Sequence, residues 1–460
     1  MNSSSTKKGI CFLVSNETRD FYLLIATIFY LEKFENYTIE FEFIWNAHKI
    51  KTAKPDLVIL PNERGNNLYY EVAQYCKTND ILVLSHDSEG NFNTQIDYDF
   101  WGLNLSKKLV CPILYTWNQR VKDYLLSKYE IPEQNCCVSG APGFDKYKYL
   151  PKINKATILA KYGKGNYNKI VGYAGWAFGK IYNAEIKDLT NYLNMSVTEG
   201  TKWLAEQRDK VEECLETVIQ KYPDILFILK KHPRENFESD YKDSRNEMNR
   251  LVRYDNVLYL KDEEVIQDLI QISDLWMAFE STSIMEAWLM DVPTLMINPV
   301  TDFNRLDFYT GSASVTNSAE ILSVFSDFFE KNQIETLTAP EIIAKRNEII
   351  SQSIGFADGF NHLRVNKAFK PFLQKRAAQK IGINWKFLRL FLLLHLGKYF
   401  YNKQLFERLP KFKKTIWVFE NYKLEKIKLL KTKTYSDLEN FYHEKGLLSK
   451  QAVDALIDKL

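Results

Sequence analysis

The chain alternates short apolar stretches with longer helical patterns from its first residues. Residues 9–15 (GICFLVS) precede a helical pattern over 18–34, and three more apolar stretches follow: IEFEFIW, DLVILPN and DILVLSH. Strands of a parallel sheet are covered on both faces, so they read as continuous apolar stretches, and the crossovers between them are usually helices. The alternation therefore predicts an α/β fold built from parallel β-α units.

A second series of the same kind begins after a polar, lysine-rich stretch at 149–169. It contains the apolar stretches KIVGYAG, ILFILKKHP, VLYL, DLWMAFE and VPTLMINP, and a long helical pattern over 200–222. Two successive series of about 150 residues predict two facing doubly wound domains, with ligands bound in an inter-domain cleft at the carboxyl ends of the strands. We predict an N-terminal βα domain over 1–150, a C-terminal βα domain over 165–380 and a basic, aromatic helical tail over 381–460.

The net charge of +3 hides an uneven distribution of charge along the chain. Residues 364–433 contain nineteen Lys or Arg but three acidic residues, an excess of 19 − 3 = +16. Together with its aromatic residues, this excess is suited to docking on anionic lipid. The alternative is that the apolar face of the tail packs on the catalytic domains while its lysines are solvated. No nucleic-acid motif accompanies the charge, so we expect no nucleic-acid partner.

Other features indicate where the protein acts. The most apolar stretch, 385–400, is interrupted by basic residues and is shorter than the roughly 20 apolar residues of a membrane span. Six scattered cysteines include no C-x-x-C pair, which indicates reduced thiols and no structural metal. We expect a cytoplasmic protein. The basic tail suggests the alternative that the protein binds peripherally to the inner face of the cytoplasmic membrane.

Positive charge follows the apolar stretch 227–229 directly. Lys231, His232 and Pro233 come at the end of this predicted strand, where the proline ends the ladder and fixes the direction of the loop. Charged hydrogen bonds to a phosphate are strong, so the segment is a candidate phosphate site. A solvated loop with a turn proline is the alternative.

Hydroxyl groups follow another predicted strand, DLWMAFE. Ser281, Thr282 and Ser283 precede a helix, and the N-terminus of a helix favours phosphate. Ser283 and Glu286 also match the S-x-x-E capping box, in which both side chains satisfy the N–H groups of their own helix. Gly175, in the segment GYAGWAFG, could allow backbone N–H groups to approach a phosphate.

Carboxylates follow a strand of the first domain. Asp87 and Glu89 lie in the segment H-D-S-E-G after the stretch ILVLS, and either could act as general base or nucleophile. An ordinary polar loop with a capping Asp87 is the alternative. A tight turn, Gly140 to Asp145 (GAPGFD), comes after a later strand.

Together these motifs resemble bacterial GT-B glycosyltransferases of surface-polysaccharide synthesis that use CMP-activated acidic sugars, such as sialyltransferases, Kdo transferases and pseudaminic or legionaminic acid transferases. The resemblance rests on the D/E-x-G loop, on GAPGFD, on the H-P and S-T-S motifs, and on DGFNHLR at 358–364. It implies a GT-B-like fold in which Glu89, or else Asp87, is the catalytic carboxylate. It also implies that His232 and Pro233 bind the CMP phosphate and that Ser281, Thr282 and Ser283 hold phosphate oxygens. His232 is a further candidate catalytic residue, and Glu286 is a candidate contact to the ribose.

The function implied is metal-independent transfer of a 2-keto sugar acid from a CMP-activated donor to a surface glycan or lipid-linked glycan. No cofactor is expected beyond the donor itself. A transferase that uses a CDP-polyol or a UDP-sugar is the first alternative, because Lys230, Lys231 and Arg234 could neutralise a second phosphate. A non-catalytic nucleotide-binding assembly protein is the second. The acidic sugar, the acceptor, the stereochemistry and the oligomeric state stay open.

Overall fold

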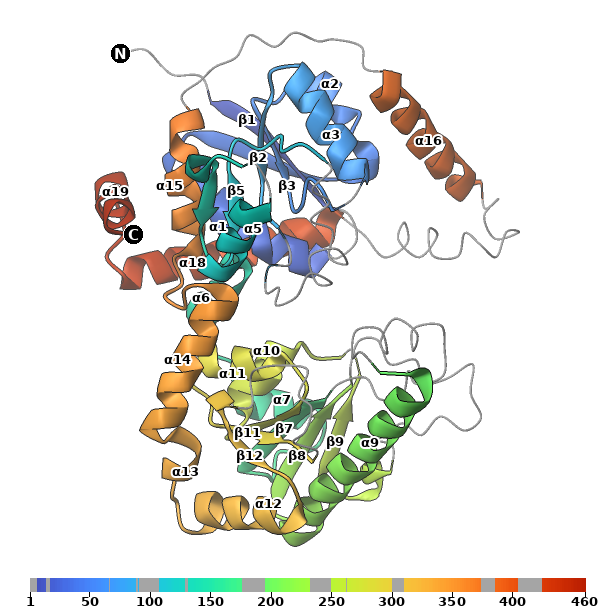
Figure 1. The fold of residues 1–460 in the computed structure, drawn as a ribbon, viewed down its shortest axis with the longest axis vertical. Helices are drawn as coiled ribbons and strands as arrows, with labels where there is room; N and C mark the ends of the chain where they lie inside the picture. Colours follow the sequence, from blue (N-terminus) through green and yellow to red (C-terminus); the bar gives the residue numbers. More distant parts are fainter. Residues whose placement is uncertain are drawn as a thin grey trace. The chain divides into compact units, whose positions relative to one another are not determined.

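The computed structural model describes residues 6–13, 17–65, 67–87, 90, 107–128, 131–175, 195–231, 250–261, 263–299, 310–373, 385–403 and 424–460. The chain forms two compact units (Figure 1). The first unit combines Met1–Leu150 with Ser351–Leu460, and the second is Pro151–Ile350.

A four-stranded parallel sheet with the order β2-β1-β3-β4 organises the first unit. Its strands are β1 (Lys7–Leu13), β2 (Tyr37–Phe43), β3 (Leu57–Leu60) and β4 (Leu82–Ser85). Successive residues of β1 alternate between two cores, since Ile10 and Phe12 lie in one and Cys11 and Leu13 in the other. Both faces of the sheet are covered, which explains the continuous apolar stretches and confirms the predicted α/β fold.

Helices cover the two faces of this sheet. On one face lie α1 (Glu17–Phe34), α15 (Asn361–Leu373) and α18 (Leu424–Glu444), which share one hydrophobic core. On the other lie η1 (Ile44–Asn46), α2 (Lys49–Ala53) and α3 (Asn67–Thr78). A smaller parallel pair follows β4 along the chain, and its elements are β5 (Leu114–Thr116), α5 (Gln119–Lys128), η2 (Glu133–Asn135) and β6 (Cys136–Val138). The chain then passes through η3 (Pro142–Phe144) and α6 (Lys146–Tyr149).

The second unit contains a six-stranded sheet with the order β12-β11-β10-β7-β8-β9, and each neighbouring pair is parallel. Its strands are β7 (Lys169–Gly175), β8 (Ile225–Lys230), β9 (Val257–Leu260), β10 (Leu275–Phe279), β11 (Thr294–Ile297) and β12 (Ala313–Val315). Because β7 lies between β10 and β8, the chain reverses its direction of growth there. This is the doubly wound topology, whose ligands bind at the carboxyl ends of the strands near the reversal.

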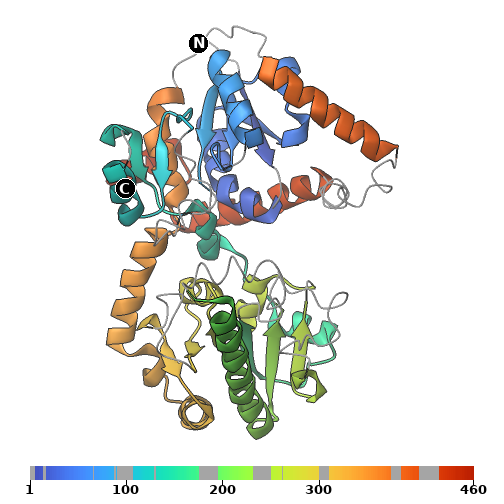
Figure 2. The same cartoon turned by 45° about the vertical axis from the view of Figure 1, so that its right-hand side comes forward.

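Helices of the second unit cover both faces of its sheet. Figure 2 shows α9 (Val197–Lys221) lying along one face, where it shares a core with α12 (Ser318–Phe325). α10 (Ile266–Ile272) packs with α11 (Ser283–Leu289), and these helices contact β7 and β10. The remaining elements of this part are α7 (Lys155–Lys161), η5 (Leu251–Arg253), the π-helical turn Ser326–Glu330, α13 (Glu335–Thr338) and α14 (Pro340–Ile354).

The division into units differs from the predicted domains at the C-terminal end. The sequence predicted a C-terminal domain that extends to residue 380, but the second unit ends at Ile350. The reason is that α15 buries Leu363 and Phe369 in the core of the first unit. The predicted tail over 381–460 is divided as well. α18 and α19 (Lys450–Lys459) contribute to that same core, whereas α16 (Trp385–Asn402) lies against α3 and η1.

Candidate functional site

Two neighbouring strands of the first unit end in charged residues. Glu63 and Arg64 follow β3, and His86 and Asp87 follow β4. Because β3 and β4 pair in parallel, their carboxyl ends meet at one edge of the sheet. Glu63, Arg64 and His86 are each at most 3% exposed, so the edge holds a buried polar cluster.

Glu63 has a structural part in this cluster. Its two carboxylate oxygens accept hydrogen bonds from the backbone N–H groups of Val110 (3.0 Å) and Cys111 (2.9 Å). Its own N–H donates to the Ser85 hydroxyl at 2.8 Å. Burial raises the pKa of the Glu63 carboxyl, while these backbone hydrogen bonds oppose the rise. Glu63 therefore holds the segment around Cys111 over the strand ends.

Arg64 and Asp87 both line a small cavity, together with Ser85, Cys111 and Tyr115. The Arg64 Nη2 and the Asp87 Oδ2 are 4.0 Å apart, and Nη2 has no hydrogen-bond partner within the described chain. Burial raises the pKa of Asp87 to about 6, and the charge of Arg64 limits the rise. A carboxylate with this pKa is ionised at neutral pH yet binds a proton readily, as a general base requires.

His86 contacts the backbone of Asp87. Its ring lies on the Tyr115 ring with centroids 5.4 Å apart, its Nε2 is 3.0 Å from the Ser139 hydroxyl, and its Nδ1 is 3.1 Å from the Asp87 carbonyl oxygen. Burial lowers the pKa of His86 to about 4, so the ring is neutral at pH 7. The neutral His86 imidazole thus lies beside the ionised Asp87 carboxylate.

The H-D-S-E-G segment is fixed at both ends. The Trp117 indole N–H donates to the Asp87 carbonyl (3.1 Å), and the Asn118 amide donates to the Gly90 carbonyl (3.4 Å). A Cβ at position 90 would lie 2.3 Å from the Trp117 ring, so only glycine fits there. Glu89, between these fixed ends, lies outside the described residues.

The second unit brings three of the predicted residues to one edge of its sheet. Gly175 ends β7, Lys231 follows β8 and Ser281 follows β10, and these strands are neighbours in the sheet. His232 and Pro233 lie outside the described residues. A Cβ at position 175 would lie 2.2 Å from the Tyr173 hydroxyl, which accounts for this glycine independently of any ligand.

Lys230 and Lys231 differ in their surroundings. The Lys230 ammonium donates to the carbonyl oxygens of Lys261 and Glu264, the latter at 2.7 Å, and so ties β8 to the segment after β9. Lys231 is half-buried, and its backbone N–H donates to the Leu260 carbonyl at 2.9 Å.

The hydroxyl segment after β10 has an internal hydrogen-bond network. The Ser281 hydroxyl donates to the Ser283 hydroxyl (3.0 Å), which also accepts the Trp276 indole N–H (3.1 Å). The capping box predicted for Ser283 and Glu286 is not formed, because the helix begins at Ser283. The N-cap residue is Thr282, which makes no side-chain capping hydrogen bond. Ser283 is buried, whereas Ser281 and Glu286 are half-buried and Thr282 is exposed.

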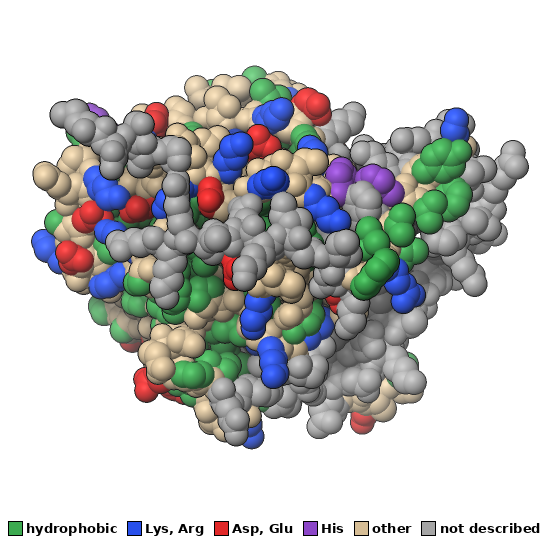
Figure 3. All heavy atoms as spheres, turned by 90° about the horizontal axis from the view of Figure 1, so that it is seen from above, with side chains coloured by type: hydrophobic (Ala, Val, Ile, Leu, Met, Phe, Trp, Pro, Cys, Tyr) green, Lys and Arg blue, Asp and Glu red, His purple; other side chains and the backbone are tan. Residues whose placement is uncertain are grey.

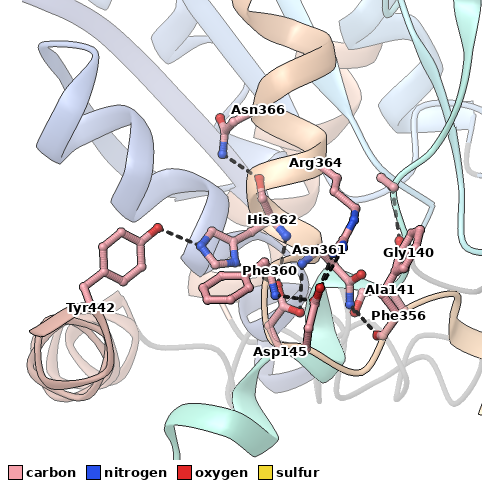
Figure 4. Close-up of polar contacts among 12 residues, drawn as sticks. Gly140, Ala141, Asp145, Phe356, Phe360, Asn361, His362, Arg364, Asn366 and Tyr442 are labelled. Atoms are coloured by element: carbon pink, nitrogen blue, oxygen red, sulfur yellow. Dashed lines mark hydrogen bonds and ion pairs between the residues drawn. The ribbon is translucent and has the colours of Figure 1, made fainter. Parts of the chain in front are cut away.

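Two of the motifs behind the sequence resemblance interlock in the first unit (Figure 4). Asp145 of GAPGFD accepts hydrogen bonds from the backbone N–H groups of Asn361 (3.1 Å) and His362 (2.9 Å) and from the His362 Nδ1 (2.8 Å). The His362 Nε2 is 2.8 Å from the Tyr442 hydroxyl on α18. The Asp145 and His362 side chains are fully buried. This network, called the joint below, connects the GAPGFD turn to the start of α15, where the chain re-enters the first unit, and to α18.

Two further interactions complete this joint. Arg364 of DGFNHLR forms a bidentate ion pair with Asp358 at 2.9 and 2.6 Å, and its guanidinium lies 3.7 Å from the centroid of the Phe356 ring. The GAPGFD and DGFNHLR motifs therefore have a structural role in this fold.

The sequence interpretation did not single out Glu63 or Arg64. The signal was present, because N-E-R-G follows the apolar stretch LVIL just as H-D-S-E-G follows ILVLS. Among the residues that the structure describes, no group of three or more His, Cys, Asp or Glu side chains is placed to hold a metal ion. No helix within the described ranges is both long enough and apolar enough to cross a bilayer.

No known protein family and no curated protein matches the chain by sequence. By structure, it is similar to a Listeria monocytogenes protein assigned as a UDP-N-acetylglucosamine 2-epimerase, with a TM-score of 0.54 and 13% identity over 83% of this chain and 100% of that one. Another UDP-N-acetylglucosamine 2-epimerase matches with a TM-score of 0.51 and 13% identity, over 82% and 99% of the two chains. The S. aureus MnaA–UDP structure matches with a TM-score of 0.50 and 13% identity, over 82% and 100%.

Similarity at 13% identity shows the fold alone. The fold is the two-domain α/β fold of the GT-B type, as the resemblance implied. The finer assignment, to transferases that use CMP-activated acidic sugars, stays a prediction.

Proposed function

We propose that the protein is a glycosyltransferase that uses a nucleotide-activated sugar, and that its donor is a CMP-activated 2-keto sugar acid of the Kdo or nonulosonic type. The acceptor would be a surface glycan or a lipid-linked glycan. The observation that carries the proposal is the Asp87 carboxylate, which follows β4, lies 4.0 Å from Arg64 and has a pKa of about 6. A partly buried carboxylate of this kind suits a general base for a sugar hydroxyl.

In this proposal Asp87 takes the proton of the acceptor hydroxyl while the hydroxyl oxygen attacks the anomeric carbon. The bond from that carbon to the CMP phosphate breaks, and the phosphate leaves with the electron pair. Arg64, which lies 4.0 Å from Asp87, keeps the carboxylate ionised before the reaction. In this proposal the reaction uses neither a metal nor another cofactor, because the leaving group has a single phosphate. Its charge rises from −1 in the donor to −2 in the released CMP, and protein groups can stabilise that charge.

The nucleotide would bind at the carboxyl edge of the second sheet. Gly175, Lys231 and Ser281 come from three neighbouring strands there, and His232 and Pro233 continue directly from Lys231. The Lys230 ammonium already donates to two carbonyl oxygens, so it is not placed to neutralise a second phosphate. This favours a donor with a single phosphate.

A UDP-sugar donor is the principal rival, followed by a CDP-polyol. The S. aureus MnaA structure of similar fold contains UDP, which is a specific reason to test uridine nucleotides. Under either rival, the edge of the second sheet would bind a diphosphate. The remaining alternative, a non-catalytic nucleotide-binding protein, would bind without turnover.

The first experiment measures thermal stabilisation of the full chain by CMP, CDP, UMP, UDP and GDP without added metal. A ligand at 100 times its Kd stabilises the protein by about 2.7 kcal/mol, which such a measurement detects. We expect CMP to stabilise more than the diphosphates at equal concentration. A preference for UDP or CDP would transfer the proposal to the rival donor, and no response to any nucleotide would contradict it.

The second experiment separates Asp87 from Glu89, the carboxylate that the resemblance favours. With the donor found above, Asp87→Asn should reduce turnover by about 10²-fold or more while nucleotide binding is retained. Asp123→Asn, a change on the exposed face of α5, is the control for the substitution itself. If Glu89→Gln abolishes turnover and Asp87→Asn does not, Glu89 is the base and Asp87 has a structural role.

A further inference from the structure

Helix α16 lies at the surface of the first unit although it is apolar around much of its circumference. It runs from Trp385 to Asn402, about 27 Å at 1.5 Å per residue. One side rests on α3 and η1, where the His395 ring meets the His48 ring edge-on at 4.7 Å. A helix with this composition is usually buried on all sides, in a protein core or against lipid.

The other side of α16 carries large apolar residues that are exposed. Leu392 and Leu393 are more than half exposed, and Trp385 is 76% exposed. The positions have helical spacing, so they form one face, whose members are Trp385, Leu392, Leu393, Leu396, Tyr399 and Phe400. Figure 3 shows hydrophobic side chains gathered along this helix, beside the two histidines.

The charged residues of the helix itself have one sign. Residues 385–403 contain four Lys or Arg and no Asp or Glu. Two of them are exposed: Arg389 lies on α16, and Lys403 directly follows it. A surface that covers this face must therefore be both apolar and anionic. A second copy of the chain, packed on the same face about a twofold axis, would bring like charges together.

Helices α18 and α19, which form the rest of the described C-terminal region, pack on the first unit. Helices α18 and α19 place Leu438, Phe441 and Val453 in the core of the first unit. Lysines of α18 pair with acidic residues of that unit, as Lys431 does with Glu32 at 2.8 Å. This part of the tail packs on the protein, which leaves α16 as the exposed apolar element of the described tail.

We propose that α16 docks the first unit on an anionic lipid surface. The helix lies in the plane of the interface, with the Trp385–Phe400 face at the boundary between headgroups and acyl chains. Arg389 and Lys403 contact the anionic headgroups, and Trp385 and Tyr399 occupy the depth that aromatic residues favour. The inference is independent of the donor and of the catalytic carboxylate.

The test is cosedimentation of the full chain with vesicles of phosphatidylcholine alone and of phosphatidylcholine with phosphatidylglycerol. We expect binding to the anionic vesicles that weakens as salt is raised. Leu393→Glu combined with Leu396→Glu should reduce the partition coefficient by about tenfold or more. Arg389→Gln and Lys403→Gln should each reduce it about fivefold, on anionic vesicles only.

Leu429→Glu is the matched control, because Leu429 is 73% exposed on α18 and lies outside the proposed face. Its partition coefficient should equal that of the unmodified chain. Thermal unfolding of each variant checks that the fold is unchanged, as the exposed side chains predict. The proposal is wrong if the unmodified chain does not cosediment with anionic vesicles. It is also wrong if the α16 double variant has the same partition coefficient as the unmodified chain. It is also wrong if that variant converts a dimer to a monomer, since a second copy would then cover the face.

Discussion

The buried joint of Asp145, His362 and Tyr442 should contribute measurably to the stability of the first unit. A carboxylate can only accept, so the His362 Nδ1–H donates to Asp145. With a neutral ring, the His362 Nε2 then accepts from the Tyr442 hydroxyl. Burial raises the pKa of Tyr442 well above its usual range, which keeps this hydroxyl protonated as a donor. The joint is therefore a single directed network.

Asp145→Ala removes an acceptor from three buried donors: two backbone N–H groups and the His362 ring. Each buried donor that is left unsatisfied costs about 1–3 kcal/mol, so a total loss of roughly 3–5 kcal/mol is expected once non-additivity is allowed for. Tyr442→Phe disturbs one hydrogen bond and should cost about 1–3 kcal/mol. The two losses should not add, because both variants disturb the same imidazole.

Differential scanning calorimetry resolves the unfolding of the first unit. At about 2–4 °C per kcal/mol, Asp145→Ala should lower its Tm by about 6–20 °C. Hydrogen exchange should show faster exchange at the amides of Asn361 and His362. The control is Asp454→Ala on α19, which removes a half-exposed pair with Lys370 and should cost below about 1 kcal/mol. Equal Tm values for the Asp145 and Asp454 variants would refute the reasoning.

Gly140→Ala and Asp87→Asn test local features of the first unit, and Gly163→Ala in the second unit is the control for Gly140→Ala. Gly140 has φ +76°, and a Cβ there would lie 1.9 Å from the Asn361 Oδ1, so Gly140→Ala should lower the stability by about 2–4 kcal/mol in thermal unfolding. Gly163 has φ +65° with open space around it, so Gly163→Ala should lower it by only about 1 kcal/mol. Similar losses for the two variants would contradict the argument. The pKa of Asp87 is raised from 3.8 to about 6, so between these values the folded state binds more protons than the unfolded state and stability falls as pH rises. Asp87→Asn should remove this fall and gain up to about 3 kcal/mol at pH 7 relative to pH 4, which urea unfolding at both pH values measures; a pH-independent difference between variant and unmodified chain would contradict it.

The pattern of the sequence was sufficient for the fold class because the signal is local. Each strand of a parallel sheet that is covered on both faces must be apolar at consecutive positions, as Ile10 to Leu13 are. The return of α15 to the first unit was not predictable in this way. Its amphipathic pattern states that Leu363 and Phe369 face a core, and it does not state which core.

The candidate site was predictable by position and less so by role. Strand ends located Asp87, Lys231 and Ser281 correctly at the carboxyl edges of their sheets. The side-chain partners depend on residues distant in sequence, so the hydrogen bonds from Lys230 to the carbonyl oxygens of Lys261 and Glu264 could not be predicted. For the same reason, the hydrogen bond from the Trp276 indole N–H to the Ser283 hydroxyl could not be predicted.

The resemblance that suggested an acidic-sugar donor rests partly on residues that cannot recognise one. Asp145 already accepts three hydrogen bonds from within the protein, and Arg364 is engaged with Asp358, so neither side chain is available to a ligand without breaking the joint. GAPGFD and DGFNHLR therefore have a structural role in the first unit. Under the proposed function, the choice of nucleotide depends on the edge of the second sheet, where Lys231 and Ser281 lie. For this reason the nucleotide panel tests the donor assignment more directly than any change in the two motifs.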